Sequence, residues 1–99
     1  MSKKPSDKQK QQWIDTLNGL VRAAGEARDA GDRLACESRL AAALEFTKAV
    51  PPLEASGLDV EAIWVTALVH LGDEPAALRR LAAATETARS RGDEVRLLR

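Results

Sequence analysis

The chain contains few of the residues that carry chemistry at active sites or metal sites. Its 99 residues include one cysteine, Cys36, and one histidine, His70. Neither an internal disulfide nor a cysteine-based metal cluster can form from a single thiol. No serine, cysteine or metal-ligand cluster accompanies His70 at a helical spacing, so we expect an ordinary surface histidine. We predict no catalytic, metal or cofactor-binding residues, and no enzyme activity.

Aromatic and β-branched residues are also scarce. The sequence has two Trp, one Phe and no Tyr, with six Val and two Ile against eighteen Ala and thirteen Leu. This composition cannot supply an all-β core and favours helices. We therefore predict an all-α fold, and the length provides for one domain.

Net charge and long apolar runs are absent as well. Fifteen basic residues balance fifteen acidic ones, and no aromatic residue is interleaved with the basic ones, so nucleic-acid binding is not expected. No apolar run approaches the roughly 18 residues of a membrane span. The start at Met1 leads through Pro5 into polar residues rather than into the apolar core of a signal peptide. These features predict a cytoplasmic protein without a membrane partner.

Local signals predict four helices. Ser6-Asp7-Lys8-Gln9 has the pattern of a capping box and starts a helix that runs to about residue 30, after a disordered tail over 1–5. Asn18-Gly19 is a turn signal inside this helix, but the apolar stripe keeps its phase across the pair, so we predict one continuous helix. The stripe consists of Trp13, Leu17, Leu20, Ala24 and Ala27.

Gly-Asp pairs divide the rest of the chain. Gly31-Asp32 suits the end of one helix and the start of the next, over 33–49, which Pro51 stops. Its buried face is expected to hold Cys36, Leu40, Ala43, Leu44 and Thr47.

The second half of the chain is predicted in the same way. After a loop over 50–57, a capping box from Ser56 to Asp59 starts a third helix over 58–71. A second Gly-Asp pair precedes a fourth helix over 74–91, and a third pair, Gly92-Asp93, precedes a short partial helix. The predicted domain spans 6–99 and consists of hairpin one over 6–49, hairpin two over 58–91 and a C-terminal tail over 92–99.

The two hairpins are related by an internal repeat. Residues 31–45 and 72–86 are identical at nine of fifteen positions when the chain is shifted by 41 residues. The shared positions include the Gly-Asp pair, an Arg-Leu pair, an Ala triplet and a Glu. A period of 41 is typical of arrays of helical hairpins.

These residues resemble the tetratricopeptide-like superfamily of αα-hairpin repeats. In that family the second helix carries small, large and small residues five, nine and twelve positions after the glycine. The corresponding residues here are Cys36, Leu40 and Ala43, then Ala77, Leu81 and Ala84. The first-helix aromatics of the family are missing, and the period exceeds the usual value of about 34. HEAT-like hairpins and a plain four-helix bundle made by duplication are therefore alternatives.

The resemblance implies a binding face on the first helix of each hairpin. The 41-residue shift places eight residues there: Val21, Arg22, Gly25, Arg28, Ala62, Val65, Thr66 and Val69. Arg22 and Arg28 would lie at the edge of a shallow apolar floor, able to meet a partner's carboxylate. The third helix is apolar around most of its circumference, so this face is either a groove or is buried by the chain itself.

The predicted function is a non-catalytic protein-interaction module, an adaptor or small chaperone that binds a segment of another protein. Small tetratricopeptide-like chaperones of bacterial secretion systems are similar in size and helix content. The alternatives are a homodimeric structural or regulatory protein, with Val65, Val69 or the C-terminal leucines at the dimer centre, and a weak nucleic-acid-binding accessory factor.

Overall fold

The structure is a computed structural model that describes residues 6–97, with the side chains of residues 6–89. The predicted tail over 1–5 lies outside this range. Four helices and one 3₁₀ turn follow one another, and no strand occurs within 6–97, as the composition predicted. The elements are α1 Asp7–Asp29, α2 Arg33–Ala49, the 3₁₀ turn Pro51–Leu53, α3 Ser56–His70 and α4 Glu74–Leu97.

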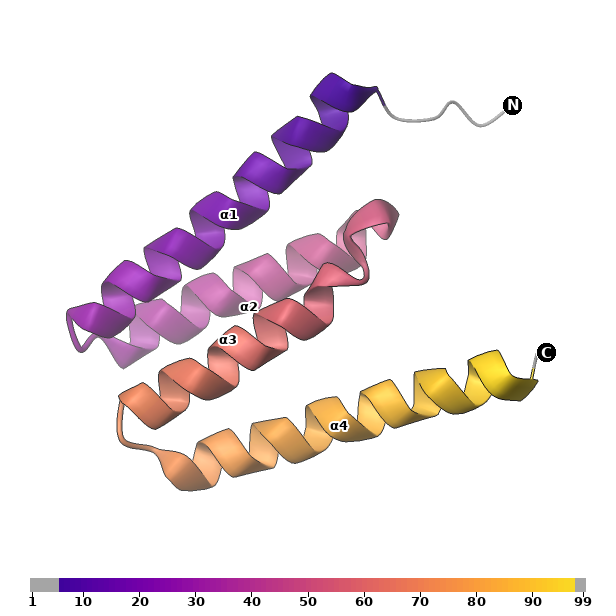
Figure 1. Cartoon of the computed structure of the whole chain (residues 1–99). Helices are drawn as coiled ribbons and strands as arrows, with labels where there is room; N and C mark the ends of the chain where they lie inside the picture. Colours follow the sequence, from indigo (N-terminus) through magenta and orange to yellow (C-terminus); the bar gives the residue numbers. More distant parts are fainter. Residues whose placement is uncertain (1–5, 98–99) are drawn as a thin grey trace.

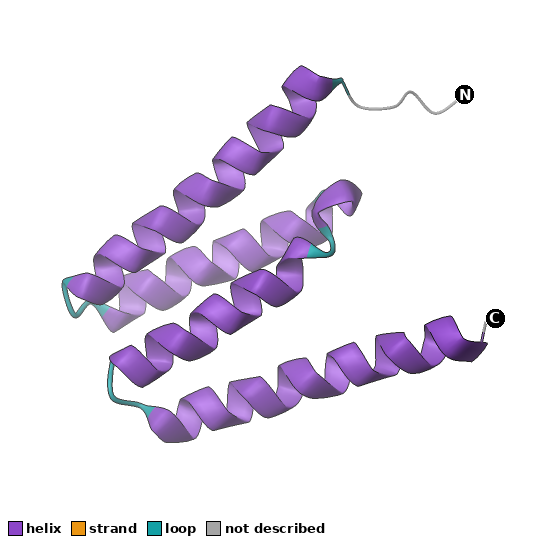
Figure 2. Ribbon diagram, viewed as in Figure 1, coloured by secondary structure: helices purple, strands orange, loops and turns teal. Residues whose placement is uncertain are grey.

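The helices form two antiparallel hairpins in tandem, α1 with α2 and α3 with α4 (Figure 1). Both hairpin turns lie at one end of the molecule, and the connection between α2 and α3 lies at the other (Figure 2). Helix α3 also packs against α2 and touches α1. The molecule measures 48 × 35 × 13 Å, so it is a thin slab in which each helix keeps an open side.

Helix α1 begins where the sequence predicts. The hydroxyl of Ser6 accepts a hydrogen bond from the backbone N–H of Gln9 at 3.1 Å, which satisfies one donor of the first helical turn. The helix then continues through Gly19, and a Cβ at this position would meet no neighbouring atom. The prediction of one continuous helix is confirmed.

The two hairpin turns have the same geometry. Gly31 and Gly72 adopt φ values of 76° and 84°, which glycine reaches without a Cβ clash. Each turn is a Schellman motif followed by an Asp N-cap, and its hydrogen bonds recur 41 residues later. The N–H of Gly31 donates to Arg28 O, and the N–H of Gly72 donates to Val69 O. The N–H of Asp32 donates to Ala27 O, and the N–H of Asp73 donates to Leu68 O. In the caps, the N–H of Ala35 donates to Asp32 Oδ1, and the N–H of Ala76 donates to Asp73 Oδ1.

The start of α3 corrects the predicted capping box. Residues 51–53 form a 3₁₀ turn rather than an open loop, and the side chain of Leu53 is buried. Ala55 is already helical, with φ −63° and ψ −27°, so α3 begins at Ser56 without a side-chain cap. The 3₁₀ turn leads directly into α3 with a helical backbone. Ser56 is therefore helical and does not adopt the extended backbone conformation of an N-cap residue.

The C-terminal end also differs from the prediction. Helix α4 continues through Gly92-Asp93 to Leu97, so no third turn and no separate partial helix form. Glycine within a helix costs only about 1 kcal/mol, which the neighbouring helical residues can offset. The Gly-Asp pairs at Gly31 and Gly72 therefore end a helix, whereas the pair at Gly92 does not.

The core lies mainly between α1, α2 and α3. The predicted α2 face is buried at Cys36, Leu40, Ala43 and Thr47, while Leu44 is half-buried. The hydroxyl of Thr47 donates to the carbonyl oxygen of Leu44 at 2.7 Å, which satisfies this buried polar group. The remaining buried apolar residues are Leu17, Ala24, Ala27, Leu53, Val60, Trp64, Ala67, Leu68 and Ala77.

Candidate functional site

Trp64 of α3 links three helices. Its side chain is only 8% exposed, and its indole Nε1–H donates to Glu37 Oε1 of α2 at 3.0 Å. From α4, the guanidinium carbon of Arg80 lies 3.4 Å from the centre of a Trp64 ring. This cation–π contact and the hydrogen bond fix the indole between α2 and α4.

Charged residues extend this contact into a network, which we call the Trp64 network. Arg80 Nε lies 2.8 Å from Glu61 Oε2, and both atoms are buried, so each charge depends on the other. On the other side Arg33 bridges Glu37 at 3.2 Å and Asp73 at 2.6 Å. The network therefore ties both hairpins and the second turn together.

Two ionisable groups of the network have shifted pKa values. The pKa of the Asp73 carboxyl lies below its usual value because the carboxylate accepts the backbone N–H of Ala76 and also pairs with Arg33. The pKa of Arg33 is raised by hydrogen bonds to the side chains of Asp73 and Glu37. Both shifts favour the charged forms and hence the ion pair.

We predict that Asp73→Ala destabilises the protein at neutral pH more than Asp32→Ala. Asp32 caps α2 in the same way but makes no ion pair within the described residues. Since the folded-state pKa of Asp73 is lowered, its stabilisation is present above the unfolded-state value of about 3.9 and is lost as pH falls through the folded-state pKa. Urea unfolding of both variants at neutral and acidic pH should show the Asp73→Ala deficit shrinking in acid. Equal deficits for the two variants at neutral pH would contradict a contribution from the Arg33 pair.

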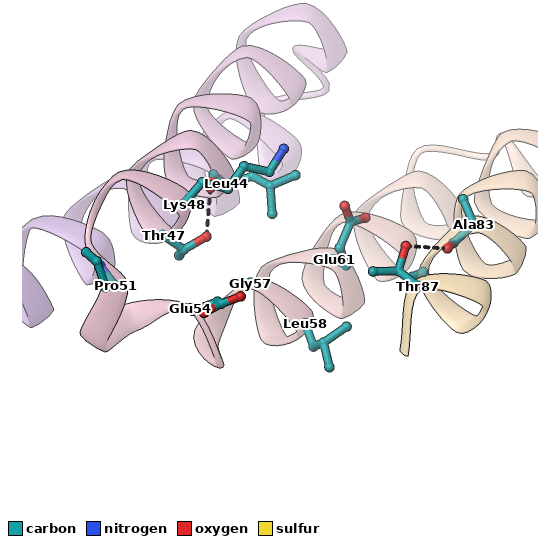
Figure 3. A pocket seen from close by; sticks show the side chains of 11 residues that line it. Leu44, Thr47, Lys48, Pro51, Glu54, Gly57, Leu58, Glu61, Ala83 and Thr87 are labelled. Carbon is teal, nitrogen blue, oxygen red and sulfur yellow. Dashed lines mark hydrogen bonds between the residues drawn. The ribbon is translucent and has the colours of Figure 1, made fainter. Parts of the chain in front are cut away.

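Beside this network lies a groove between α2 and α4, with α3 as its floor. It consists of two adjoining cavities of about 460 and 550 Å³, which share Leu44, Lys48, Glu61 and Ala83. We call it the α2–α4 groove, and Figure 3 shows the first cavity. The other lining residues are Thr47, Pro51, Glu54, Gly57, Leu58, Ala84 and Thr87 in the first cavity, and Glu37, Leu68, Ala76, Arg79 and Arg80 in the second.

Small residues make the groove. Gly57 lies at the start of α3, where a Cβ would be 3.3 Å from Thr47 Oγ1, so α2 and α3 approach each other closely at this point. Ala83 and Ala84 face the groove from α4. Larger side chains at these positions would occupy the space between α2 and α4.

The charge that remains available around the groove is mainly positive. Glu37, Glu61 and Arg80 are engaged in the Trp64 network. Arg79 is exposed, and Lys48 makes only an exposed contact with Glu45 at 3.5 Å. Such surface pairs contribute little, so both cations can meet an anionic group. Glu54 also lines the groove, at the end near α2 and the 3₁₀ turn.

The eight residues of the predicted first-helix face lie on α1 and α3, which are in contact. The exposed members are Arg22, Ala62, Thr66 and Val69, and the half-buried ones are Val21, Gly25, Arg28 and Val65. Arg28 already pairs with Asp29 at 3.0 Å. α3 is therefore buried on its Trp64 side and open on the other, and none of the eight residues lines either cavity of the α2–α4 groove.

Neither the α2–α4 groove nor the Trp64 network was predicted from the sequence. The signal for the groove is the set of small residues at 57, 83 and 84, which leaves α4 without large side chains toward α2. The network has no such signal because Glu37 and Arg80 lie 27 and 16 residues from Trp64 along the chain. Helical periodicity relates residues that are three or four positions apart, so it cannot predict contacts at these separations.

Cys36 and His70 occupy different environments. Cys36 is buried between helices, and burial raises the pKa of its thiol, so the neutral form predominates. His70 is exposed at the C-terminal end of α3. Within the part of the chain that the structure describes, no three metal-ligating side chains converge.

No family model, no curated protein and no solved structure matches this chain. Among residues 6–97, no helix combines the length and the hydropathy needed to cross a bilayer.

Proposed function

We propose that the chain is a non-catalytic protein-interaction module, an adaptor or small chaperone, that holds a segment of another protein in the α2–α4 groove. The observation that carries the proposal is an open groove of several hundred Å³ whose walls are held apart by the Trp64 network. A site held in place before binding loses less conformational entropy when a partner docks. The resemblance to tetratricopeptide-like hairpins supports the same class of function.

The lining residues indicate the chemistry of the partner. Leu44, Leu58 and the two alanines of α4 provide an apolar surface for a few aliphatic side chains. Lys48 and Arg79 favour a carboxylate beside them. We therefore propose a short helical or extended segment with small apolar residues next to an Asp or Glu.

The first-helix face is a second candidate for the docking surface. Val69 and Ala62 are exposed on α3, and Arg22 is exposed on α1 with no ion pair among the described residues. The resemblance implies an apolar floor with a basic edge on this face. Neither cavity of the α2–α4 groove extends to this face.

A peptide-display selection on the purified chain tests the function and separates the two surfaces. We expect enriched peptides to combine apolar residues with an acidic residue. Ala83→Glu places a carboxylate in the groove, and we expect at least about tenfold weaker binding, or about 1.4 kcal/mol. The matched variant Ala62→Glu changes an exposed alanine on the first-helix face, and it should bind as the wild type does.

Circular dichroism and the melting temperature serve as folding controls, and both should be unchanged because exposed substitutions cost little. Loss of binding by Ala62→Glu alone would contradict the groove and favour the first-helix face. A selection without enrichment, repeated at several salt concentrations, would contradict the interaction function itself.

A further inference from the structure

The outer side of α4 is exposed where the matching side of α2 is buried. The 41-residue shift pairs Leu81 with Leu40, but Leu81 is 48% exposed and Leu40 is 0% exposed. One turn earlier Leu78 is 65% exposed, and Thr85 one turn later is exposed as well. We call Leu78, Leu81, Thr85 and Ala88 the α4 stripe. Their spacings of three, four and three residues place them on one helical face.

Helix α3 covers the matching stripe of α2. Trp64 bonds to Glu37 there, and Gly57 lies against Leu44 and Thr47. These three α2 residues correspond to Leu78, Thr85 and Ala88 of α4. No helix within residues 6–97 occupies the same place beside α4. The α4 stripe is therefore the open end of the hairpin stack.

The α4 stripe and the α2–α4 groove are different surfaces. Four α4 residues of the groove, Ala76, Arg80, Ala83 and Thr87, lie on the side of α4 away from the stripe in a helix of 3.6 residues per turn, and Ala84 lies at the border between the two surfaces. A partner in the groove therefore leaves the stripe free. The two surfaces can be tested independently.

The charged residues at the two ends of the α4 stripe indicate which partner can bind it. Glu74 lies at its N-terminal end and pairs with none of the described residues, while Arg89 lies at its C-terminal end and makes one exposed contact with Glu86 at 3.7 Å. When two such helices pack antiparallel with Leu81 near the centre, each Glu74 lies close to the Arg89 of the other copy. The helix dipoles are also opposed in this arrangement.

In a head-to-tail stack, the α4 stripe of one copy would pack against α1 of the next copy, and the residues of α1 disfavour this contact. On α3 the residues Gly57 and Trp64 contact α2, and the shift pairs them with Thr16 and Ala23. These α1 residues are small or polar and offer little apolar surface to an incoming α4. A twofold contact avoids this mismatch because the same apolar stripe is buried on both copies.

We propose that the α4 stripe binds a second copy of this chain, with the two α4 helices antiparallel about a twofold axis. The contact consists of one helix on one helix, which is at the small end of specific interfaces. The dimer is therefore weak, with a dissociation constant of about 10 to 100 µM. It forms and dissociates within the range of protein concentration that sedimentation can sample.

Sedimentation equilibrium over this range tests the proposal. We expect the wild type to shift from monomer to dimer, and Leu78→Ser/Leu81→Ser to remain monomeric with unchanged circular dichroism. Leu34→Ser is the matched control, since Leu34 is 82% exposed and lies outside the α4 stripe. It should dimerise as the wild type does. A wild type that stays monomeric, or a stripe variant that dimerises normally, would overturn the proposal.

A charge exchange tests the orientation. Glu74→Arg alone and Arg89→Glu alone should each weaken the dimer at least about threefold, because like charges then meet across the twofold axis. The combined variant Glu74→Arg/Arg89→Glu should restore wild-type dimerisation. Failure of the combined variant to recover, with its helix content intact, would overturn the antiparallel arrangement.

Discussion

Trp64→Ala is expected to lower the free energy of unfolding by about 3–5 kcal/mol, the cost typical of removing a buried aromatic side chain. The substitution empties the space between α2, α3 and α4, and it leaves Glu37 without the indole N–H and Arg80 without the ring beneath its guanidinium. A domain of this size is stable by about 5–15 kcal/mol, so the variant should be partly unfolded under mild conditions. Urea unfolding followed by circular dichroism measures the change.

Trp64→Phe provides the comparison. It keeps an aromatic ring for Arg80 but removes the donor to Glu37, so we expect a loss of about 1–2 kcal/mol. Trp13, half-buried on α1, is the second comparison, and Trp13→Ala should cost less than Trp64→Ala. Similar losses for the two alanine variants would show that the contacts between the helices at Trp64 contribute nothing beyond ordinary burial.

The second large effect concerns Leu40 and its counterpart in the second hairpin. Leu40→Ala should cost about 2–5 kcal/mol, because its side chain is fully buried between helices. Leu81→Ala, at the matching position, should cost under about 1 kcal/mol when measured on the monomer at low concentration. Thermal or urea unfolding of both variants provides the comparison. Equal losses would mean that Leu81 is as well covered as Leu40, contrary to the exposed α4 stripe.

Much of the fold could be predicted because its boundaries depend on local chemistry. The left-handed glycines Gly31 and Gly72 and the caps Ser6, Asp32 and Asp73 act within a single turn of chain. The sequence displays such features directly. The apolar stripe of α1 was likewise sufficient to predict a helix that continues through Asn18-Gly19.

The errors arose where neighbouring structure decides between local alternatives. Ser56 has the pattern of an N-cap, but the 3₁₀ turn before it fixes a helical approach. Gly92 has the pattern of a turn, yet α4 continues through it to Leu97. The groove was missed for the same reason, since the separation of α2 from α4 depends on Arg80, Glu61 and Trp64 meeting across helices.

The small side chains of the core also affect how stability depends on temperature. Of the twelve buried apolar residues among those described, five are alanine: Ala24, Ala27, Ala43, Ala67 and Ala77. A slab 13 Å thick built around methyl groups exposes little apolar surface when it unfolds. We therefore expect a heat capacity of unfolding below the usual value of about 1.2–1.5 kcal/mol/K for a domain of this length. We expect a correspondingly shallow stability curve, with a free energy of unfolding that changes little across a broad range of temperature.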